Sequence, residues 1–264
     1  MLTVNNKLKY MLLLLKKILN QFLKYFGYSI YNIHKTDDYI RIQEISNYEN
    51  ELINKCKMYS MTPKLRMWAL IQAFYHVINK KIEGDLVECG IWKGGNIILL
   101  LNLLEKFNIK KNIYGFDTFE GMPEPTSIDI KYNQIIAKNI QLKNFVNQTK
   151  WNHSSIEEVK KNIKNNSTNY NQSILIKGKV EHTLLNEKNI PSKISILRLD
   201  TDFYESTKIE LEVLYKKLSI GGVLIIDDYG NWLGAKKAVD EFFNKQKPWL
   251  HYIDRTCRLL IKSH

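Results

Sequence analysis

Apolar and polar positions between residues 85 and 261 follow two alternating patterns. Short apolar runs, which are typical of buried strands, alternate with longer segments in which apolar residues recur every three or four positions, as in amphipathic helices. The predicted strands are 85–89, 112–117, 173–178, 194–200 and 223–227, and the predicted helices between and after them are 96–107, 155–165, 206–218 and 235–244. Because crossover helices join parallel strands, this order predicts an α/β fold with a doubly wound, mostly parallel sheet.

Further segments extend this predicted core at both ends and in its middle. Residues 249–253 and 257–261 are close enough in sequence to form a closing antiparallel pair. Residues 124–151 are polar and lack clear periodicity, which favours an insertion or a lid. A helix begins near Thr62, which we expect to cap it, with Pro63 at its first position.

An amphipathic helix is predicted near the N-terminus, over residues 8–26. Its apolar residues recur at steps of four and three, and lysines occupy the opposite side, with no acidic residue before position 37. A basic helix of this kind, taken as residues 5–26, favours peripheral contact with an anionic membrane surface. Packing against its own domain, or against a second subunit in a homo-oligomer, is an equal alternative. Gly27 is expected to end the helix.

The length of 264 residues fits one main domain, 58–264, preceded by an N-terminal helix and connector, 1–57. A hydrophobic fraction of 44% and a charged fraction of 25% are ordinary for a folded protein. The net charge of +12 raises the question of nucleic acid, but the lysines are spread along the whole chain and do not interleave with aromatic residues. We therefore expect no nucleic-acid partner.

Cysteine usage and the short apolar runs indicate the cellular compartment in which the protein is expected. The three cysteines lie far apart and show no CxxC spacing, which favours a reducing cytosol over a disulfide framework. The apolar run Met11–Leu15 is too short for a spanning helix or a signal-peptide core. We expect a cytoplasmic protein, with peripheral attachment to the inner membrane surface as the alternative that the N-terminal helix raises.

Candidate ligand-binding residues follow the first two predicted strands, because open parallel sheets bind ligands beyond the carboxyl ends of their strands. After the first strand, Glu88 is followed by glycines at 90, 94 and 95, which let a ligand approach the backbone closely. The GxGxxG pattern is absent, and an acidic residue suits an amino group better than a pyrophosphate. After the second strand, Asp117 can accept both hydroxyls of a ribose. The structural alternatives are a simple strand-to-helix turn and a capping aspartate.

Four aspartates follow the last two parallel strands. Asp200 and Asp202 end one strand, and Asp227 and Asp228 end the other. Carboxylates gathered at one sheet edge repel one another unless a cation or hydrogen bonds offset the repulsion. Oxygen ligands favour Mg²⁺ or another hard divalent cation over zinc. The alternative is that these acids serve as caps or as ion-pair partners of the many lysines.

Five segments of the chain resemble the macrocin O-methyltransferase family. They are YSMTPKLRMWAL (59–70), GDLVECGIWKGG (84–95), YGFDTFEGMPEPT (114–126), ILRLDTDFYEST (196–207) and LSIGGVLIIDDYGNWLGAKKAVDEFF (218–243). Their order and spacing make the match specific. The resemblance implies a class I methyltransferase with a Rossmann-like fold that binds S-adenosylmethionine and uses Mg²⁺. It also implies methylation of a sugar hydroxyl, in the assembly of a glycosylated natural product or a cell-surface polysaccharide.

The resemblance also implies site residues. It assigns the methionine part of the cofactor to Glu88 and Gly90, the ribose to Asp117, and the metal to Asp200, Asp227 and Asp228. Three residues in the same cofactor segments, Gly94, Thr118 and Phe119, are further cofactor-binding candidates.

The residue expected to deprotonate the acceptor hydroxyl differs from the one used by a related group of enzymes. Catechol-type O-methyltransferases have a similar aspartate trio and a lysine three residues after the first aspartate, which helps to deprotonate the substrate. Here that position is Phe203. We therefore expect Asp202, beside the metal ligands, to act as the base in preference to His251, and Asp200 to contribute to catalysis through the metal and through orientation of the acceptor.

Two other functions use some of the same residues. One is a non-catalytic scaffold that binds the cofactor and keeps the aspartates as caps. The other is a nicotinamide-dependent oxidoreductase, which the glycine spacing disfavours. For the methyltransferase, the expected partner is a small molecule or a glycan, and the fold does not specify which sugar.

Overall fold

The computed structural model describes residues 2–28, 42–133, 135–146 and 151–263, and it divides into two compact units, 1–43 and 44–264. The smaller unit contains the helix α1 (Leu2–Tyr25). Gly27 follows with a φ of 79°, and the amide of Tyr28 donates to the carbonyl of Leu23, so the predicted helix and its glycine cap are confirmed. Among the described residues, no helix has the length and apolar character needed to cross a membrane.

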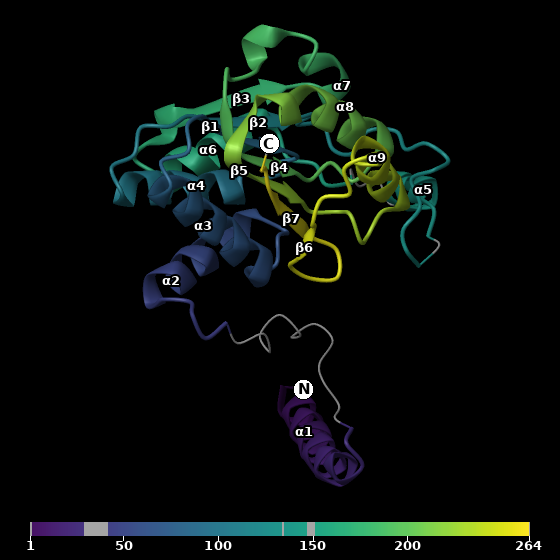
Figure 1. Cartoon of the computed structure of the whole chain (residues 1–264). Coiled ribbons are helices and arrows are strands. Elements are labelled where there is room, and N and C mark those ends of the chain that lie inside the picture. The colour runs from purple at the N-terminus through teal and green to yellow at the C-terminus, as the bar shows by residue number, and fades with distance from the viewer. Residues whose placement is uncertain (1, 29–41, 134, 147–150, 264) are drawn as a thin grey trace. The chain divides into compact units, whose positions relative to one another are not determined.

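A seven-stranded sheet forms the centre of the larger unit (Figure 1). The strands are β1 (Asp85–Cys89), β2 (Ile113–Asp117), β3 (Ser173–Lys177), β4 (Ile194–Leu199), β5 (Leu218–Ile226), β6 (His251–Tyr252) and β7 (Arg258–Ile261). Their order is β3-β2-β1-β4-β5-β7-β6. The first five strands in this order are parallel, and β7 pairs antiparallel with both β5 and β6. The predicted doubly wound sheet and its antiparallel closing pair are therefore confirmed.

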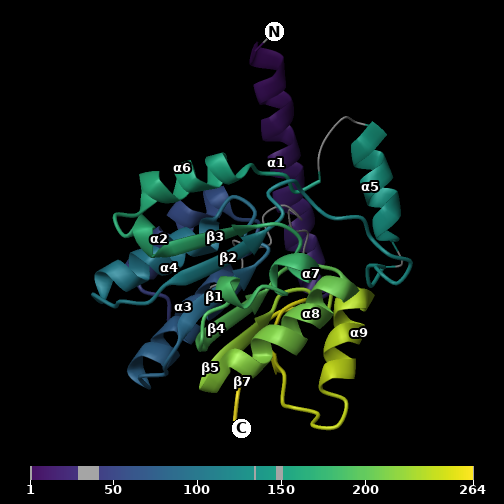
Figure 2. The same cartoon turned by 90° about the horizontal axis from the view of Figure 1, so that it is seen from above.

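Helices cover both faces of the sheet (Figure 2). They are α2 (Asn47–Cys56), α3 (Lys64–Asn79), α4 (Gly95–Lys106), α6 (Ile156–Asn166), α7 (Val180–Thr183), α8 (Tyr204–Leu214) and α9 (Leu233–Phe242). Neighbouring residues of β1 point to opposite faces, as strand geometry requires. Leu86 belongs to the core formed with α2, α3, α4 and α6, whereas Val87 belongs to the core formed with α7, α8 and α9.

The packed core of the larger unit begins earlier in the chain than the sequence pattern predicts, because it includes α2. Residues 47–56, predicted as part of a connector with a weak helical signal, form a helix that buries Leu52, Ile53 and Cys56 in the first core. Ser46 caps the helix, because its hydroxyl accepts from the amide of Glu49 while the Glu49 carboxylate accepts from the amide of Ser46.

The segment predicted as an insertion or lid contains a further helix, α5 (Ala137–Val146). Asp129 anchors the insertion. This residue is 1% exposed, and its carboxylate accepts from the backbone amides of Thr126 and Tyr204, at 2.7 and 2.9 Å. Backbone pairing between Lys131 and Trp232 adds a second attachment. The insertion is thus tied to the first residue of α8, beside the loop that follows β4.

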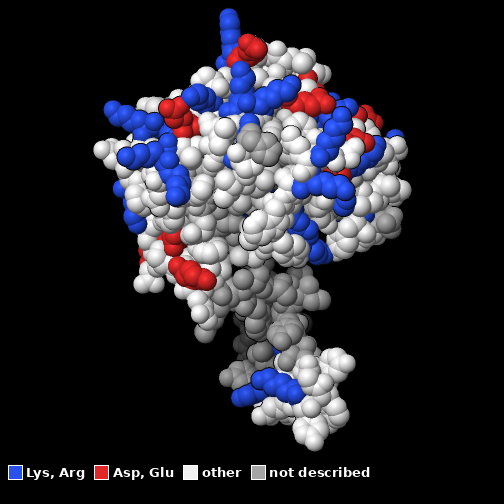
Figure 3. Space-filling model, viewed as in Figure 1, with Lys and Arg blue, Asp and Glu red and all other residues white. Residues whose placement is uncertain are grey.

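Lysine and arginine side chains are distributed over several parts of the face shown in Figure 3, with acidic side chains among some of them. Attraction to a polyanion such as nucleic acid is strongest where basic residues form a continuous patch or stripe. The face in view presents several separate groups instead.

The capping box of α2 gives a test of its place in the core. Replacing Ser46 by Ala removes the acceptor for the Glu49 amide, so the free energy of unfolding should fall by about 1 kcal/mol. Urea denaturation followed by circular dichroism measures this change. An unchanged unfolding midpoint would show that α2 adds nothing to the stability of the larger unit.

Candidate active site

A cavity of about 220 Å³ opens at the carboxyl ends of the parallel strands, where the strand order reverses between β1 and β4. This is the position at which doubly wound sheets bind ligands. Its lining residues come from α3 and the turn before it, from the carboxyl ends of the five parallel strands and the segments that follow them, and from Asn152: Met61, Thr62, Arg66, Gly90, Trp92, Phe116, Asp117, Thr118, Gly121, Met122, Pro123, Asn152, Gly178, Lys179, Val180, Glu181, Asp200, Thr201, Asp202, Ser206 and Asp227.

The turn after β1 requires glycine at position 90. Gly90 has a φ of 81°, and a Cβ at this position would lie 2.0 Å from the carbonyl oxygen of Asp200. The close approach of the two strand ends thus depends on the missing side chain. Gly94, also predicted to bind cofactor, has a φ of 86° and forms the N-cap of α4. It does not line the cavity.

Asp117 organises the backbone on one side of the cavity. Its Oδ2 accepts from the amides of Ile91 and Trp92, at 2.9 and 3.0 Å, and its Oδ1 accepts from the amide of Phe119 at 2.8 Å. Burial raises its pKa against the lowering effect of these amides. Asp117 therefore has the capping role that the sequence left as its alternative, and it also lines the cavity together with Thr118. The Phe119 ring lies in the core, outside the cavity lining.

Glu88 lies behind the cavity wall rather than in it. The residue is 2% exposed, and its Oε1 accepts from Arg198 at 2.6 Å and from the Asn96 amide at 2.8 Å. Its Oε2 has no hydrogen-bond partner. The guanidinium of Arg198 thus takes the place beside this carboxylate that the sequence reasoning gave to an amino group of a ligand.

Thr62 is a correction to the predicted cap of α3. Pro63 occupies the N-cap position, where no side chain makes a capping hydrogen bond. The Thr62 hydroxyl instead accepts from Asn96 and Arg198, both at 3.1 Å. The buried guanidinium of Arg198 has five N–H donors, and the Thr62 hydroxyl supplies an acceptor for one of them. A buried donor without a partner would be costly.

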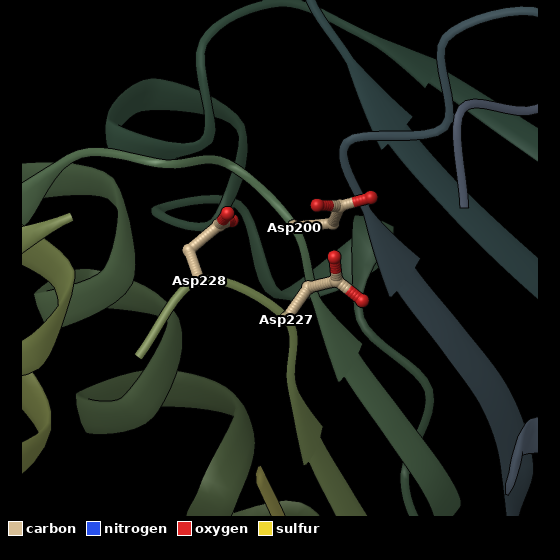
Figure 4. A group of neighbouring side chains, drawn as sticks. All are labelled: Asp200, Asp227 and Asp228. Atoms are coloured by element: carbon tan, nitrogen blue, oxygen red, sulfur yellow. The ribbon is translucent and has the colours of Figure 1, made fainter. Parts of the chain in front are cut away.

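Asp200, Asp227 and Asp228 converge at the ends of β4 and β5 (Figure 4). Each offers one carboxylate oxygen, and these three oxygens lie within 4.8 Å of one another. Burial raises the pKa of Asp200 well above its usual range, although Arg198 opposes this shift. Burial and the nearby Asp202 likewise raise the pKa of Asp228. Burial is the main cause of both pKa shifts, and repulsion from neighbouring carboxylates adds to it.

Arginines, rather than the predicted lysines, are the ion-pair partners of this cluster. Arg198 donates to Asp200 at 2.8 Å and to Asp227 at 2.6 Å, and Arg66 donates to Asp227 at 2.5 Å. Arg66 also donates through Nε to Asp254, which lies between β6 and β7, at 2.6 Å. Sequence reasoning assigned no role to either arginine. An arginine inside the apolar strand Ile194–Leu199 is a signal that would have found Arg198.

Asp202, the predicted base, lies at the cavity next to the cluster. Its φ of 67° is unusual for a residue with a side chain, and its amide donates to Asp228 Oδ2 at 3.3 Å. Burial raises its pKa to about 7. Phe203, at the position of the lysine in catechol-type enzymes, packs with Trp151 and Trp232.

The end of β3 also contributes cavity residues, although the sequence analysis predicts no site residue after this strand. Four consecutive residues, 178–181, line the cavity together with Gly121 and Met122, which follow β2. The rule that ligands bind at the carboxyl ends of parallel strands would have included them.

Comparison with known proteins gives this site a context. Residues 27–260 match the sequence model of the macrocin-O-methyltransferase family. The chain is 31% identical over 204 residues to demethyldecarbamoylnovobiocin O-methyltransferase from Streptomyces niveus, which covers 75% of this chain and 74% of the relative. Over 159 residues it is 31% identical to a Streptomyces olivaceus enzyme, 8-demethyl-8-(2,3-dimethoxy-alpha-L-rhamnosyl)-tetracenomycin-C 4'-O-methyltransferase, covering 58% of this chain and 56% of the relative.

Solved structures support the same assignment. The structure of the O-methyltransferase NovP has a TM-score of 0.67 and 30% identity, over 78% of this chain and 83% of that protein. The calicheamicin methyltransferase CalS11, with a TM-score of 0.54 and 20% identity over 83% of this chain and 94% of that protein, shares the fold. The chain therefore belongs to the macrocin O-methyltransferase family and is an S-adenosylmethionine-dependent O-methyltransferase with a class I fold.

Proposed function

We propose that this enzyme uses a hard divalent cation, Mg²⁺ in the first place, to transfer a methyl group from S-adenosylmethionine to a hydroxyl of a sugar. The observation that carries the proposal is the convergence of Asp200, Asp227 and Asp228 at a cavity that also contains the glycine turn after β1. The relatives are named as O-methyltransferases of demethyldecarbamoylnovobiocin, of a rhamnosyl-tetracenomycin and, in a third case from Micromonospora griseorubida, of mycinamicin III. Their names support a glycosylated natural product as acceptor, and a cell-surface glycan belongs to the same chemical class.

The cofactor half of the proposal rests on the turns after β1, β2 and β3. Gly90 leaves room for a ligand beside the backbone. Asp117 retains acceptor capacity at Oδ1, which accepts one backbone amide, whereas Oδ2 already accepts two. Asp117 and Thr118 would receive the ribose, while the residues after β3 would complete that wall. Glu88 would act from behind, through Arg198 and Asn96, to fix the shape of the turn.

The metal half rests on the charge and chemistry of the donor set. Six carboxylates, those of Glu88, Asp200, Asp202, Asp227, Asp228 and Asp254, face only the two arginines Arg66 and Arg198 among the described ion pairs. A divalent cation held by Asp200, Asp227 and Asp228 would offset this excess, and oxygen donors suit Mg²⁺. When bound, such a cation lowers the pKa of a coordinated hydroxyl and orients it.

Asp202 is the side chain best placed to take the proton of the acceptor hydroxyl. It lines the cavity, lies beside the carboxylate cluster and has a pKa raised to about 7, which is suited to proton transfer near neutral pH. His251 lies on the exposed strand β6 and does not line the cavity. Trp92 and Met122 contribute apolar surface, which would hold the acceptor and exclude water.

Asp228 gives the clearest test of the metal. Unlike Asp227, it forms no ion pair with an arginine among the described residues, so Asp228→Asn removes a metal ligand while leaving the arginine contacts in place. An acceptor is first identified by a screen with labelled cofactor against nucleotide sugars, glycosylated macrolides and lipid-linked glycans. With that acceptor, the kcat of the Asp228→Asn variant should fall on the order of a hundredfold relative to the wild type. EDTA should have a similar effect on the wild type.

The matched control is Asp240→Asn, because Asp240 lies on α9 and hydrogen-bonds to Tyr229 and Lys236, outside the cavity lining. It should retain the activity of the wild type. Full activity of the Asp228 variant, or of the wild type in EDTA, contradicts the metal assignment.

Asp117 gives the corresponding test of the cofactor site. Asp117→Ala should weaken S-adenosylmethionine binding by about 2 kcal/mol, because a ribose hydroxyl and three backbone amides lose a charged acceptor. Isothermal titration calorimetry measures the change. Asp85→Ala is the control, since Asp85 makes a similar contact with the amide of Asn112 at the opposite end of β1. Equal cofactor affinity of the two variants would leave Asp117 with its capping role alone.

We also propose that α1 attaches the enzyme peripherally to the cytoplasmic membrane surface. Exposed apolar residues follow one another along this helix, among them Leu12, Leu15, Leu19 and Phe22, which are 47–63% exposed. Basic residues accompany them, and the first turn contains no acidic residue. Such a helix lies in the headgroup region of an anionic bilayer with its lysines at the surface. The alternative partner for the same apolar face is a second subunit.

Vesicle sedimentation distinguishes these partners. The full chain should bind vesicles of anionic phospholipid at low salt and be released as salt rises, because lysines near the surface contribute about 1 kcal/mol each and are screened by ions. Leu15→Glu combined with Phe22→Glu should abolish binding without unfolding the larger unit. If the wild type ignores the vesicles and the double variant changes oligomeric state, α1 packs against protein.

A further inference from the structure

The two arginines at the carboxylate cluster differ in how they are held. Arg198 is 2% exposed and is fixed by four acceptors on Glu88, Asp200, Asp227 and Thr62. Arg66, in the first turn of α3, is 14% exposed and lines the cavity. Arg198 is thus a buried part of the sheet edge, whereas Arg66 is a positive charge that faces the space in which ligands bind.

Asp227 is the point at which the two arginines meet the predicted metal site. Its Oδ1 accepts from Arg198 at 2.6 Å and its Oδ2 accepts from Arg66 at 2.5 Å, so both of its oxygens already carry a charged hydrogen bond. Asp228 has no such partner within the described part of the chain, and there Arg198 donates to Oδ2 of Asp200. A cation at the cluster would therefore share Asp227 with two guanidinium groups.

Electrostatics predicts the consequence of this sharing. A guanidinium and a divalent cation that bind the same carboxylate lie only a few ångströms apart, where repulsion between their charges amounts to several kcal/mol even at an effective dielectric constant of about 20. A hydrogen bond to a metal-ligating side chain normally favours metal binding, because it orients that side chain. Such a bond contributes about ten- to a hundredfold in metal affinity. At this distance the repulsion is the larger effect.

We infer that Arg66 lowers the affinity of the carboxylate cluster for a divalent cation, by holding Asp227 from the cavity side in competition with the metal. This inference rests on the proposed metal dependence. Arg66 then keeps the cation exchangeable, so that oxygens of the acceptor contribute to its retention and the site is completed only when a substrate is present. Asp254 moderates the effect, because it neutralises part of the Arg66 charge through Nε.

The test is a titration of the metal-stripped full chain with Mn²⁺, in which free Mn²⁺ is measured by its electron paramagnetic resonance signal. Arg66→Gln should bind Mn²⁺ about tenfold more tightly than the wild type, because the competing charge is removed. Arg66→Lys, which keeps the charge, should stay close to the wild type. Arg255→Gln is the matched control, since Arg255 is exposed on the same loop as Asp254 and contacts Tyr132. It should also match the wild type.

A second variant covers the case in which Arg66→Gln does not fold. Asp254→Asn leaves the Arg66 charge less neutralised, so its Mn²⁺ affinity should fall severalfold. Unchanged or weaker binding by a folded Arg66→Gln variant, or unchanged binding by Asp254→Asn, overturns the inference while the metal site stands. Absence of Mn²⁺ binding by the wild type and by every variant overturns the metal assignment and the role of Arg66 together.

Discussion

The guanidinium of Arg198 is buried among carboxylates from three neighbouring strands, and the edge of the sheet depends on it. It joins Glu88 of β1, Asp200 after β4 and Asp227 after β5, with distances of 2.6–2.8 Å. Burying one positive charge costs several kcal/mol, but leaving three carboxylates together without it would cost more. The ion pairs therefore serve less to stabilise the fold than to keep acids close together at one place.

This constraint explains why other residues around the cavity are what they are. The backbone carbonyl of Asp200 comes so close to Gly90 that no side chain fits there, and the turn after β1 is left open toward the cavity. Thr62 accepts from Arg198, and Asn96 donates to both Glu88 and Thr62, so these two side chains extend the same hydrogen-bond network. The turn after β1 and the aspartate cluster after β4 and β5 are thus parts of one hydrogen-bonded unit, since a shift of β4 would displace both.

The fold and four of the five strand ends at the cavity could be predicted from the sequence, because strand periodicity and the position of acids and glycines are local features. Contacts made across the sheet were not predictable in this way. Arg66 reaches Asp227 and Asp254 from positions 161 and 188 residues away, and no local pattern marks such a partner. Thr62 has the sequence of a helix cap, yet tertiary hydrogen bonds give it a different role. Likewise α2 is weakly helical by pattern, and its capping box and core packing stabilise it.

Strained backbone around the cavity is held by the same carboxylates. Trp92, Phe119 and Asp202 follow three different strands and have φ values of 47°, 54° and 67°, a region that costs residues with side chains 1–3 kcal/mol each. In each case the strained residue donates its own amide to an aspartate, Asp117 for the first two and Asp228 for the third. A carboxylate that accepts an amide in this way compensates the strain and fixes the direction of the side chain that follows. The aspartates at this sheet edge therefore shape the cavity through their backbone contacts, and this is a physical reason why a capping role is compatible with the ligand-binding role proposed for the same residues.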